Sequence, residues 1–194
     1  PQDGAIPHNQ GLNMAGSQVF ILLFRGVGGK TQLPTAPLRA ALLADGFEKA
    51  ATYINSGNAL VRTDRSAAEV VARTADLGRS AFGFDKEIYA LTLADWQARM
   101  ASNPFPEATE PGRLLHMAVL AKAPDPDRVD ALREVAGAGE RIAVVGETAW
   151  LHTPNGFGTS NLAAKFDKGI GVANTARNWN TVVKLAQLAE AMAG

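Results

Sequence analysis

Residues 50–63 read AATYINSGNALVRT, and this stretch decides the fold that the sequence predicts. Two short segments, Ala50–Ile54 and Ala59–Thr63, flank the polar run Asn55-Ser56-Gly57-Asn58. Asparagine and glycine tolerate a positive φ, so the polar run predicts the tight turn of a β-hairpin. Helical patterns precede and follow it, which places a pair of strands between two helices.

Working outward, one strand precedes the first helix and another follows the second. Gln18–Phe24 (QVFILLF) is a continuous apolar run typical of a buried strand. The remaining elements are a helix capped by Thr35 and ended by Asp45-Gly46, a helix from Ser66 toward Gly83, and an alternating strand at Lys86–Leu91. The order strand–helix–strand–strand–helix–strand is that of the ferredoxin-like split βαβ fold.

The rest of the chain repeats part of this order. The predicted elements are a helix from Thr92 to Ala101, a strand Leu114–Leu120, a helix from Asp125-Pro126, a hairpin of Arg141–Val145 with Thr148–Leu151, and helices at Leu162–Phe166 and Asn178–Ala193. We therefore expect an α+β protein of two ferredoxin-like halves packed into one compact unit, with boundaries at 17–91 and 92–194. We interpret residues 1–16 as an N-terminal tail, and a vector origin is one explanation for the part before Met14.

Composition excludes several classes of protein. Lys and Arg total 19, as do Asp and Glu, so the formal net charge is zero and a nucleic-acid role would need a local basic patch. The absence of cysteine excludes thiolate nucleophiles, cysteine-ligated zinc and iron–sulfur clusters, and it suits a cytoplasmic location. No apolar run reaches the roughly 18 residues of a transmembrane helix, so we expect no membrane association.

The loop Arg25–Pro34 (RGVGGKTQLP) is rich in glycine, and its residues Gly29-Lys30-Thr31 match the GKT at the end of a Walker A motif. That motif requires a glycine five residues before Gly29, where this chain has Phe24. Pro34 also prevents a helix from starting directly at Lys30-Thr31, so a P-loop is rejected. A different anion-binding nest, using Arg25 and Lys30, and a simple turn are the two remaining interpretations.

Two further segments hold the other candidate ligand-binding residues. Asn55, Ser56 and Asn58 either serve hairpin geometry alone or line a polar pocket. Arg177 precedes Asn178, the predicted N-cap of the last helix, and Trp179 follows as a core residue or a stacking platform. A cation at a helix N-terminus is unfavourable, so we expect either a carboxylate or a bound anion beside Arg177.

Catalytic motifs are weak. His116 and His152 lie in predicted strands without metal-ligand spacing, and we interpret both as ordinary strand residues. No nucleophile-elbow pattern surrounds Ser56 or Ser160, and no acidic pair stands out. We predict neither a metal nor another cofactor.

Four segments in order resemble a bacterial family known as domain of unknown function 1697. They are the Arg25–Leu33 loop, Thr52–Asn58 (TYINSGN), Ser160-Asn161-Leu162, and Thr175–Leu185 (TARNWNTVVKL). The resemblance spans roughly residues 18–190 and implies two ferredoxin-like halves. It implies no activity, ligand or catalytic residue.

The leading functional hypothesis is a non-catalytic binding protein for a small anionic ligand or a nucleic-acid segment. It is based on the cations Arg25, Lys30 and Arg177 among polar loop residues, because loops carry function more often than core positions. The alternatives are a small cofactor-independent enzyme with a carboxylate acid–base group and a protein-interaction module, with a homo-oligomer among the arrangements left open.

Overall fold

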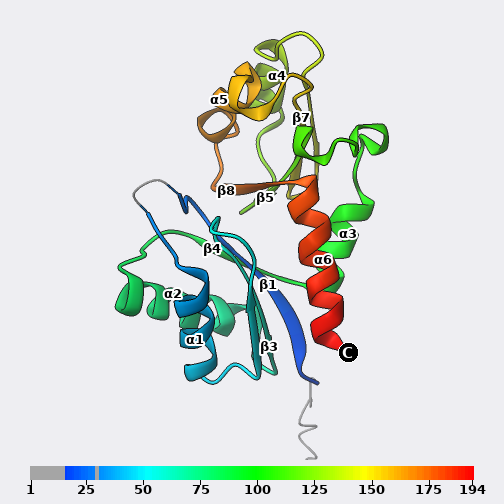
Figure 1. The fold of residues 1–194 in the computed structure, drawn as a ribbon. Coiled ribbons are helices and arrows are strands. Elements are labelled where there is room, and N and C mark those ends of the chain that lie inside the picture. Colours follow the sequence, from blue (N-terminus) through cyan, green and yellow to red (C-terminus); the bar gives the residue numbers. More distant parts are fainter. Residues whose placement is uncertain (1–15, 29–30) are drawn as a thin grey trace, which may run out of the picture.

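Two stacked halves, each built on a four-stranded antiparallel sheet, make up the computed structural model (Figure 1). The structure describes residues 16–28 and 31–194. Most of the predicted tail and the candidate residue Lys30 lie outside these described residues.

The first half has the predicted ferredoxin-like order. Its elements are β1 (Gln18–Phe24), α1 (Thr35–Ala44), β2 (Lys49–Thr52), β3 (Asn58–Thr63), α2 (Ala67–Phe82) and β4 (Ile88–Thr92). The strands lie in the order β2-β3-β1-β4, with every neighbouring pair antiparallel. Ser66 caps α2 in a reciprocal capping box with Glu69, as predicted from its sequence position. The predicted cap at Thr35 is wrong by one residue, because Pro34 occupies the N-cap position without a side-chain bond.

Strand β1 is apolar and buried after its first residue, Gln18, and both of its faces are covered. Phe20, Leu22 and Phe24 pack beneath α1 and α2, whereas alternate residues of the strand point to the opposite face and join a core shared with the second half. A one-sided strand would alternate apolar and polar residues, so this run already indicates a buried central strand.

The second half repeats the same topology. Its elements are β5 (Leu115–Leu120), α4 (Pro126–Glu134), β6 (Arg141–Val145), β7 (Thr148–His152), α5 (Asn161–Gly169) and β8 (Asn174–Asn178). The sheet order β6-β7-β5-β8 matches that of the first half position for position. The fold class, α+β with two ferredoxin-like halves, is therefore confirmed.

Strand β8 was not predicted. Its sequence, Asn174 to Asn178, is polar and only five residues long, so it carries neither apolar alternation nor β-branched enrichment beyond one threonine. The segment forms a strand because it pairs with the edge of β5, where Met117 lies opposite Arg177. Asn178 still caps the following helix as predicted, accepting a hydrogen bond from the Thr181 amide at 3.0 Å.

A helix follows the fourth strand of each half, and the two helices join the halves. They are α3 (Leu93–Ala101) and α6 (Trp179–Ala193), while short 3-10 turns occupy Pro106–Ala108, Gly112–Leu114 and Phe157–Thr159. Helix α6 lies along β1 and β3 of the first sheet and α3 lies beside it (Figure 1). The buried Trp96 Nε1 donates to Val182 O at 3.1 Å. A single apolar cluster then runs from the first sheet through α3 and α6 to the second sheet, so the halves share one core.

Among the described residues, none of the helices is both long and apolar enough to cross a lipid bilayer.

Candidate binding site at the seam between the halves

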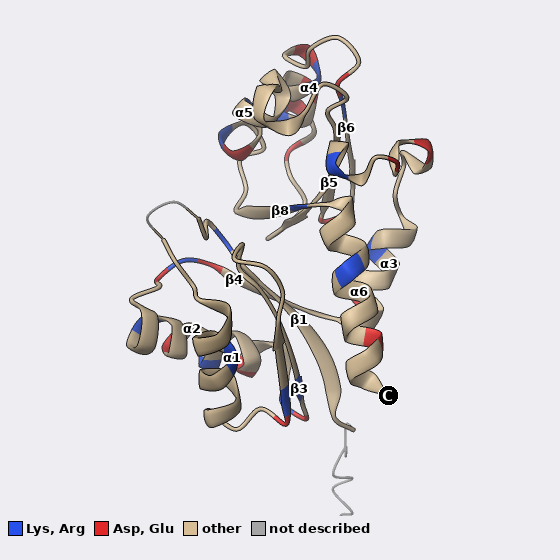
Figure 2. Ribbon diagram, in the orientation of Figure 1, with Lys and Arg blue, Asp and Glu red and all other residues tan. Residues whose placement is uncertain are grey.

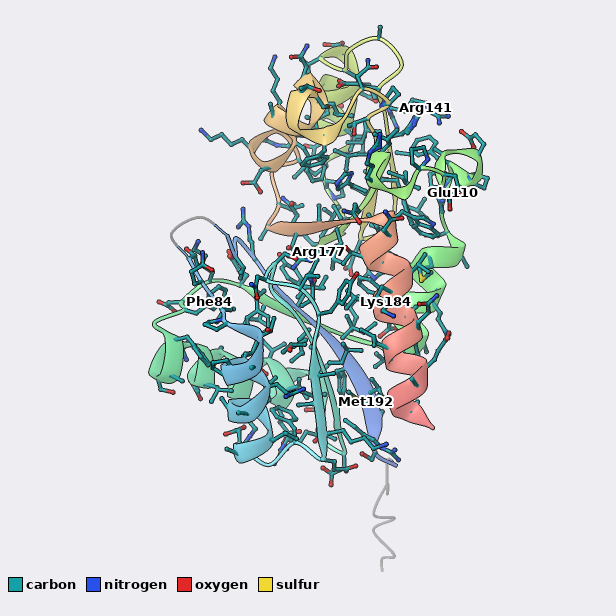
Figure 3. The ribbon with its side chains drawn as sticks, in the orientation of Figure 1. Phe84, Glu110, Arg141, Arg177, Lys184 and Met192 are labelled. Carbon is teal, nitrogen blue, oxygen red and sulfur yellow. The ribbon has the colours of Figure 1, made fainter. Side chains whose placement is uncertain are left out.

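Arg177 of β8 reaches from the second half into the first (Figure 3). All five guanidinium donors are used. Nε donates to Asn58 Oδ1 (2.5 Å), Nη1 to Thr175 Oγ1 (2.9 Å) and Ala176 O (2.7 Å), and Nη2 to Phe24 O (3.2 Å) and Gly57 O (2.9 Å). Three of these acceptors belong to the first half, so one side chain connects the end of β1 and the β2–β3 turn to β8. We call this junction the seam: Phe24, Arg25, Gly57 and Asn58 from the first half, and Asp167, Asn174 and Arg177 from the second.

The acceptors around Arg177 are all neutral. Burial lowers the pKa of Arg177 to about 10, which still leaves the guanidinium charged at neutral pH. Among the described residues no carboxylate forms an ion pair with it, so the expectation of a carboxylate partner is wrong. Carbonyl, amide and hydroxyl oxygens instead solvate the cation and offset its unfavourable position before α6.

The β2–β3 turn is fixed by Asn58, whose side chain is almost fully buried. Its Nδ2 donates to Tyr53 O and Ser56 Oγ, both at 3.1 Å, while its Oδ1 accepts from Arg177. Gly57 adopts φ 72° and packs so closely that a Cβ would lie 2.7 Å from Phe24 O. The polar residues therefore do more than close a hairpin, because they also receive the second half.

Arg25 makes the second connection across the seam. Its guanidinium lies 3.3 Å from Glu87 and 2.8 Å from Asp167 on α5, and Asn174 also donates to that Asp167 oxygen at 3.1 Å. Burial alone would lower the pKa of Arg25, but the bonds and charges of Asp167 and Glu87 raise it above its ordinary value. The Asp167 side chain is 64% exposed, so this ion pair adds only about 0–1 kcal/mol and can be exchanged.

The structure thus brings Arg25, Ser56, Asn58 and Arg177 to one place. Asn55 lies exposed on the same turn. Asn178 is used as the cap of α6, and Trp179 packs on Trp150 with ring centroids 5.8 Å apart.

Sequence reasoning missed other residues, both in the seam (Asp167) and next to it (Lys86 and Tyr89). Lys86 Nζ donates to Gly26 O and Thr31 Oγ1, both at 3.2 Å, and thereby adds a cation to the glycine-rich loop. The Tyr89 hydroxyl is buried and has no hydrogen-bond partner among the described residues, and burial with the Glu87 charge raises its pKa. A lone lysine, tyrosine or aspartate in a polar segment carries no local signal, so only the three-dimensional arrangement reveals these residues.

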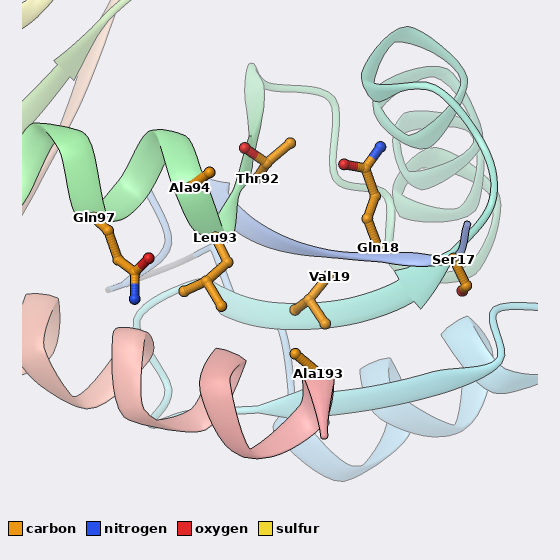
Figure 4. Close-up of a pocket in the computed structure, with 8 residues that line it drawn as sticks. All are labelled: Ser17, Gln18, Val19, Thr92, Leu93, Ala94, Gln97 and Ala193. Carbon is orange, nitrogen blue, oxygen red and sulfur yellow. The ribbon is translucent and has the colours of Figure 1, made fainter. Parts of the chain in front are cut away.

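Two surface hollows lie away from the seam. One of about 350 Å³ is lined by Ser17, Gln18, Leu93, Gln97 and Ala193, far along α6 from the seam (Figure 4). Another, of about 250 Å³, is bounded by Arg113 and Phe157. Neither includes a residue of the seam.

Three carboxyl groups away from the seam, Glu69, Glu107 and Glu140, accept hydrogen bonds that lower their pKa. No group of three or more His, Asp or Glu residues within 16–28 and 31–194 could hold a metal ion.

The comparisons with known proteins agree with this fold. The family described as "Protein of unknown function (DUF1697)" matches residues 18–150. A conserved bacterial protein, SP0830 from Streptococcus pneumoniae, has a similar structure, with a TM-score of 0.65 and 24% identity over 90% of this chain and 99% of its own. No curated protein matches the sequence.

The chain belongs to the DUF1697 family, which confirms the resemblance seen in the sequence. The structural neighbour supports the fold alone at this level of identity.

Replacing Arg177 by Met tests its role in the seam. The substitution removes the side-chain donor of Phe24 O and Asn58 Oδ1, whereas Gly57 O keeps its bond from the Phe24 amide at 2.9 Å. Each unpaired buried acceptor costs about 1–3 kcal/mol, so we expect the free energy of unfolding in urea to fall by about 2 kcal/mol or more. The matched control Arg39→Met, on the exposed face of α1, should change it by less than about 0.5 kcal/mol. Equal effects of the two variants would contradict this role.

His116 predicts a pH dependence of stability. Burial under Phe157, with ring centroids 4.0 Å apart, lowers its pKa to about 4 from the ordinary 6.5. Because the folded pKa is the lower one, the unfolded chain binds more protons between these values. The His116 contribution to stability is therefore complete above pH 6.5 and falls by about 3 kcal/mol as the pH drops to 4.

The comparison of wild type with His116→Leu isolates this effect, because leucine cannot titrate. The unfolding free energy of the wild type minus that of His116→Leu should become smaller, or more negative, from pH 7 to pH 4.5. A difference that stays constant over this range would show that His116 titrates normally.

Proposed function

We propose that this protein is a non-catalytic binding protein for an anionic ligand, a nucleotide, another phosphate-bearing metabolite or a nucleic-acid segment, which binds at the seam. The observation that carries the proposal is that three cations from separate segments meet one short stretch of backbone at the end of β1: Arg177 binds Phe24 O, Arg25 follows Phe24, and Lys86 binds Gly26 O. Two carboxylates, Glu87 and Asp167, pair with Arg25 there, so the three cations outnumber the carboxylates by one. Summed charge of one sign beside a low-dielectric wall attracts an anion.

The three cations play different parts. Arg177 has no donor left for a ligand, so it acts by holding the turn in place and by its charge. Arg25 is bound to two largely exposed carboxylates and can turn from Asp167 to a phosphate at small cost. Lys86 holds the glycine-rich loop by two bonds and supplies a second mobile charge.

In this proposal Asp167 competes with the ligand for Arg25. An incoming phosphate displaces a carboxylate that is already mostly in water, which loosens the contact between α5 and the first half. The shared apolar core through α3 and α6 stays intact, so only the polar side of the junction changes. A bacterial source and a cytoplasmic location, suited by a chain without cysteine, complete the proposal.

Two substitutions with opposite expected effects test this function. The Kd for tripolyphosphate and ATP would be measured by calorimetry for Arg25→Gln and Asp167→Asn. We expect Arg25→Gln to weaken binding at least tenfold through the loss of a charge-assisted contact. Asp167→Asn should strengthen it severalfold, because it removes the competing carboxylate.

Arg39→Gln, an exposed arginine on α1, is the matched control and should leave the Kd unchanged. The proposal fails if no polyanion binds the wild type, or if Arg25→Gln and Arg39→Gln bind equally well. A short single-stranded oligonucleotide, measured beside ATP, separates a nucleic-acid ligand from a small molecule.

A further inference from the structure

Ile54 has a backbone conformation that isoleucine rarely adopts. It lies in the β2–β3 turn with φ 46°, in the left-handed region, and it is the one non-glycine residue with positive φ among those the structure describes. A β-branched side chain crowds the backbone there, whereas asparagine or glycine would fit readily. The residue is also 50% exposed, so burial in this fold does not compensate for the strain.

The surrounding contacts impose this conformation on Ile54. Tyr53 N donates to Asn58 O at 3.0 Å, and Asn58 Nδ2 returns a bond to Tyr53 O at 3.1 Å. Arg177 then holds Gly57 O from the second half at 2.9 Å. The fold thus over-determines the turn, and residue 54 could be any side chain that tolerates positive φ. Strain kept in this way is typical of residues selected for contact with a ligand.

The turn lies next to the cationic loop. A Cβ at Gly57 would fall 2.8 Å from Val27 Cγ2, so the turn and the β1–α1 loop touch. Arg25 is the first residue of this loop, directly after β1. Lys86, which precedes β4, donates a hydrogen bond to Gly26 O in the same loop. The turn that carries the exposed Ile54 therefore touches the loop that follows Arg25 and accepts a bond from Lys86.

We infer that Ile54 is a ligand-contact residue and that the anionic ligand carries a flat apolar group, as a nucleotide carries its base. The phosphates lie against Arg25 and Lys86, and the face of the base packs on the outward Ile54 side chain. This inference rests on the proposed function, because it assigns the uncharged part of the same ligand. It accounts for an exposed isoleucine at a position where the backbone favours asparagine.

The test separates the base from the phosphates. The Kd for ATP and for tripolyphosphate would be measured with wild type, Ile54→Asn and Leu43→Asn. Leu43 is the matched control, an aliphatic residue that is 46% exposed near the end of α1. Ile54→Asn should weaken ATP at least tenfold and change tripolyphosphate by less than twofold. Leu43→Asn should change neither.

Thermal unfolding tests whether the Ile54→Asn variant is folded and whether the backbone strain at residue 54 is relieved. Asparagine tolerates positive φ, so the Tm of Ile54→Asn should rise by about 2–4 °C. If Ile54→Asn leaves ATP binding unchanged, or if wild type binds ATP no tighter than tripolyphosphate, the role of Ile54 is overturned while anion binding stands. If neither probe binds wild type, both proposals fall.

Discussion

The guanidinium of Arg177 is the contact on which the polar side of this molecule depends. A buried cation needs its donors satisfied, and here the second half contributes the charge while the first half contributes three of five acceptors. The β2–β3 turn, the end of β1 and strand β8 therefore hold their relative positions through one side chain. Because the acceptors are neutral, the charge itself is retained, and it lies where Arg25 and Lys86 also gather.

The two sides of the junction differ in physical character. Along α3 and α6 the halves share a continuous apolar core, whose packing resists any gradual displacement. At the seam they meet through hydrogen bonds and exposed ion pairs, which exchange with water or with a ligand at little cost. Segments with Lys or Arg and segments with Asp or Glu are interspersed along the described part of the ribbon (Figure 2). Recognition of an anion would thus be local, as the neutral net charge requires.

Much of the fold was predictable because local patterns and tertiary structure agree. The run Gln18–Phe24 and the Ser66 cap each specify their elements without help from distant residues. Strand β8 was not predictable, since its polar residues form a strand only when β5 offers an edge. The turn around Gly57 shows the same limit, because its composition indicated positive φ for Asn and Gly, whereas Gly57 and Ile54 adopt it and Asn55 and Asn58 do not. Asp167 is 142 residues from its partner Arg25, and Asn58 is 119 residues from its partner Arg177, and a single sequence holds no signal for such pairs.

An NMR titration with tripolyphosphate at constant ionic strength tests the central claim directly, because it reports where an anion binds. We predict that the amide and side-chain signals of Arg25, Gly26, Val27 and Lys86 shift in a saturable way. The Nε signal of Arg177 should shift little, because its bonds are already made, and the amides along α4 should not move. Saturable shifts confined to another surface, or no saturable shift at all, would contradict the assignment of the seam as an anion site.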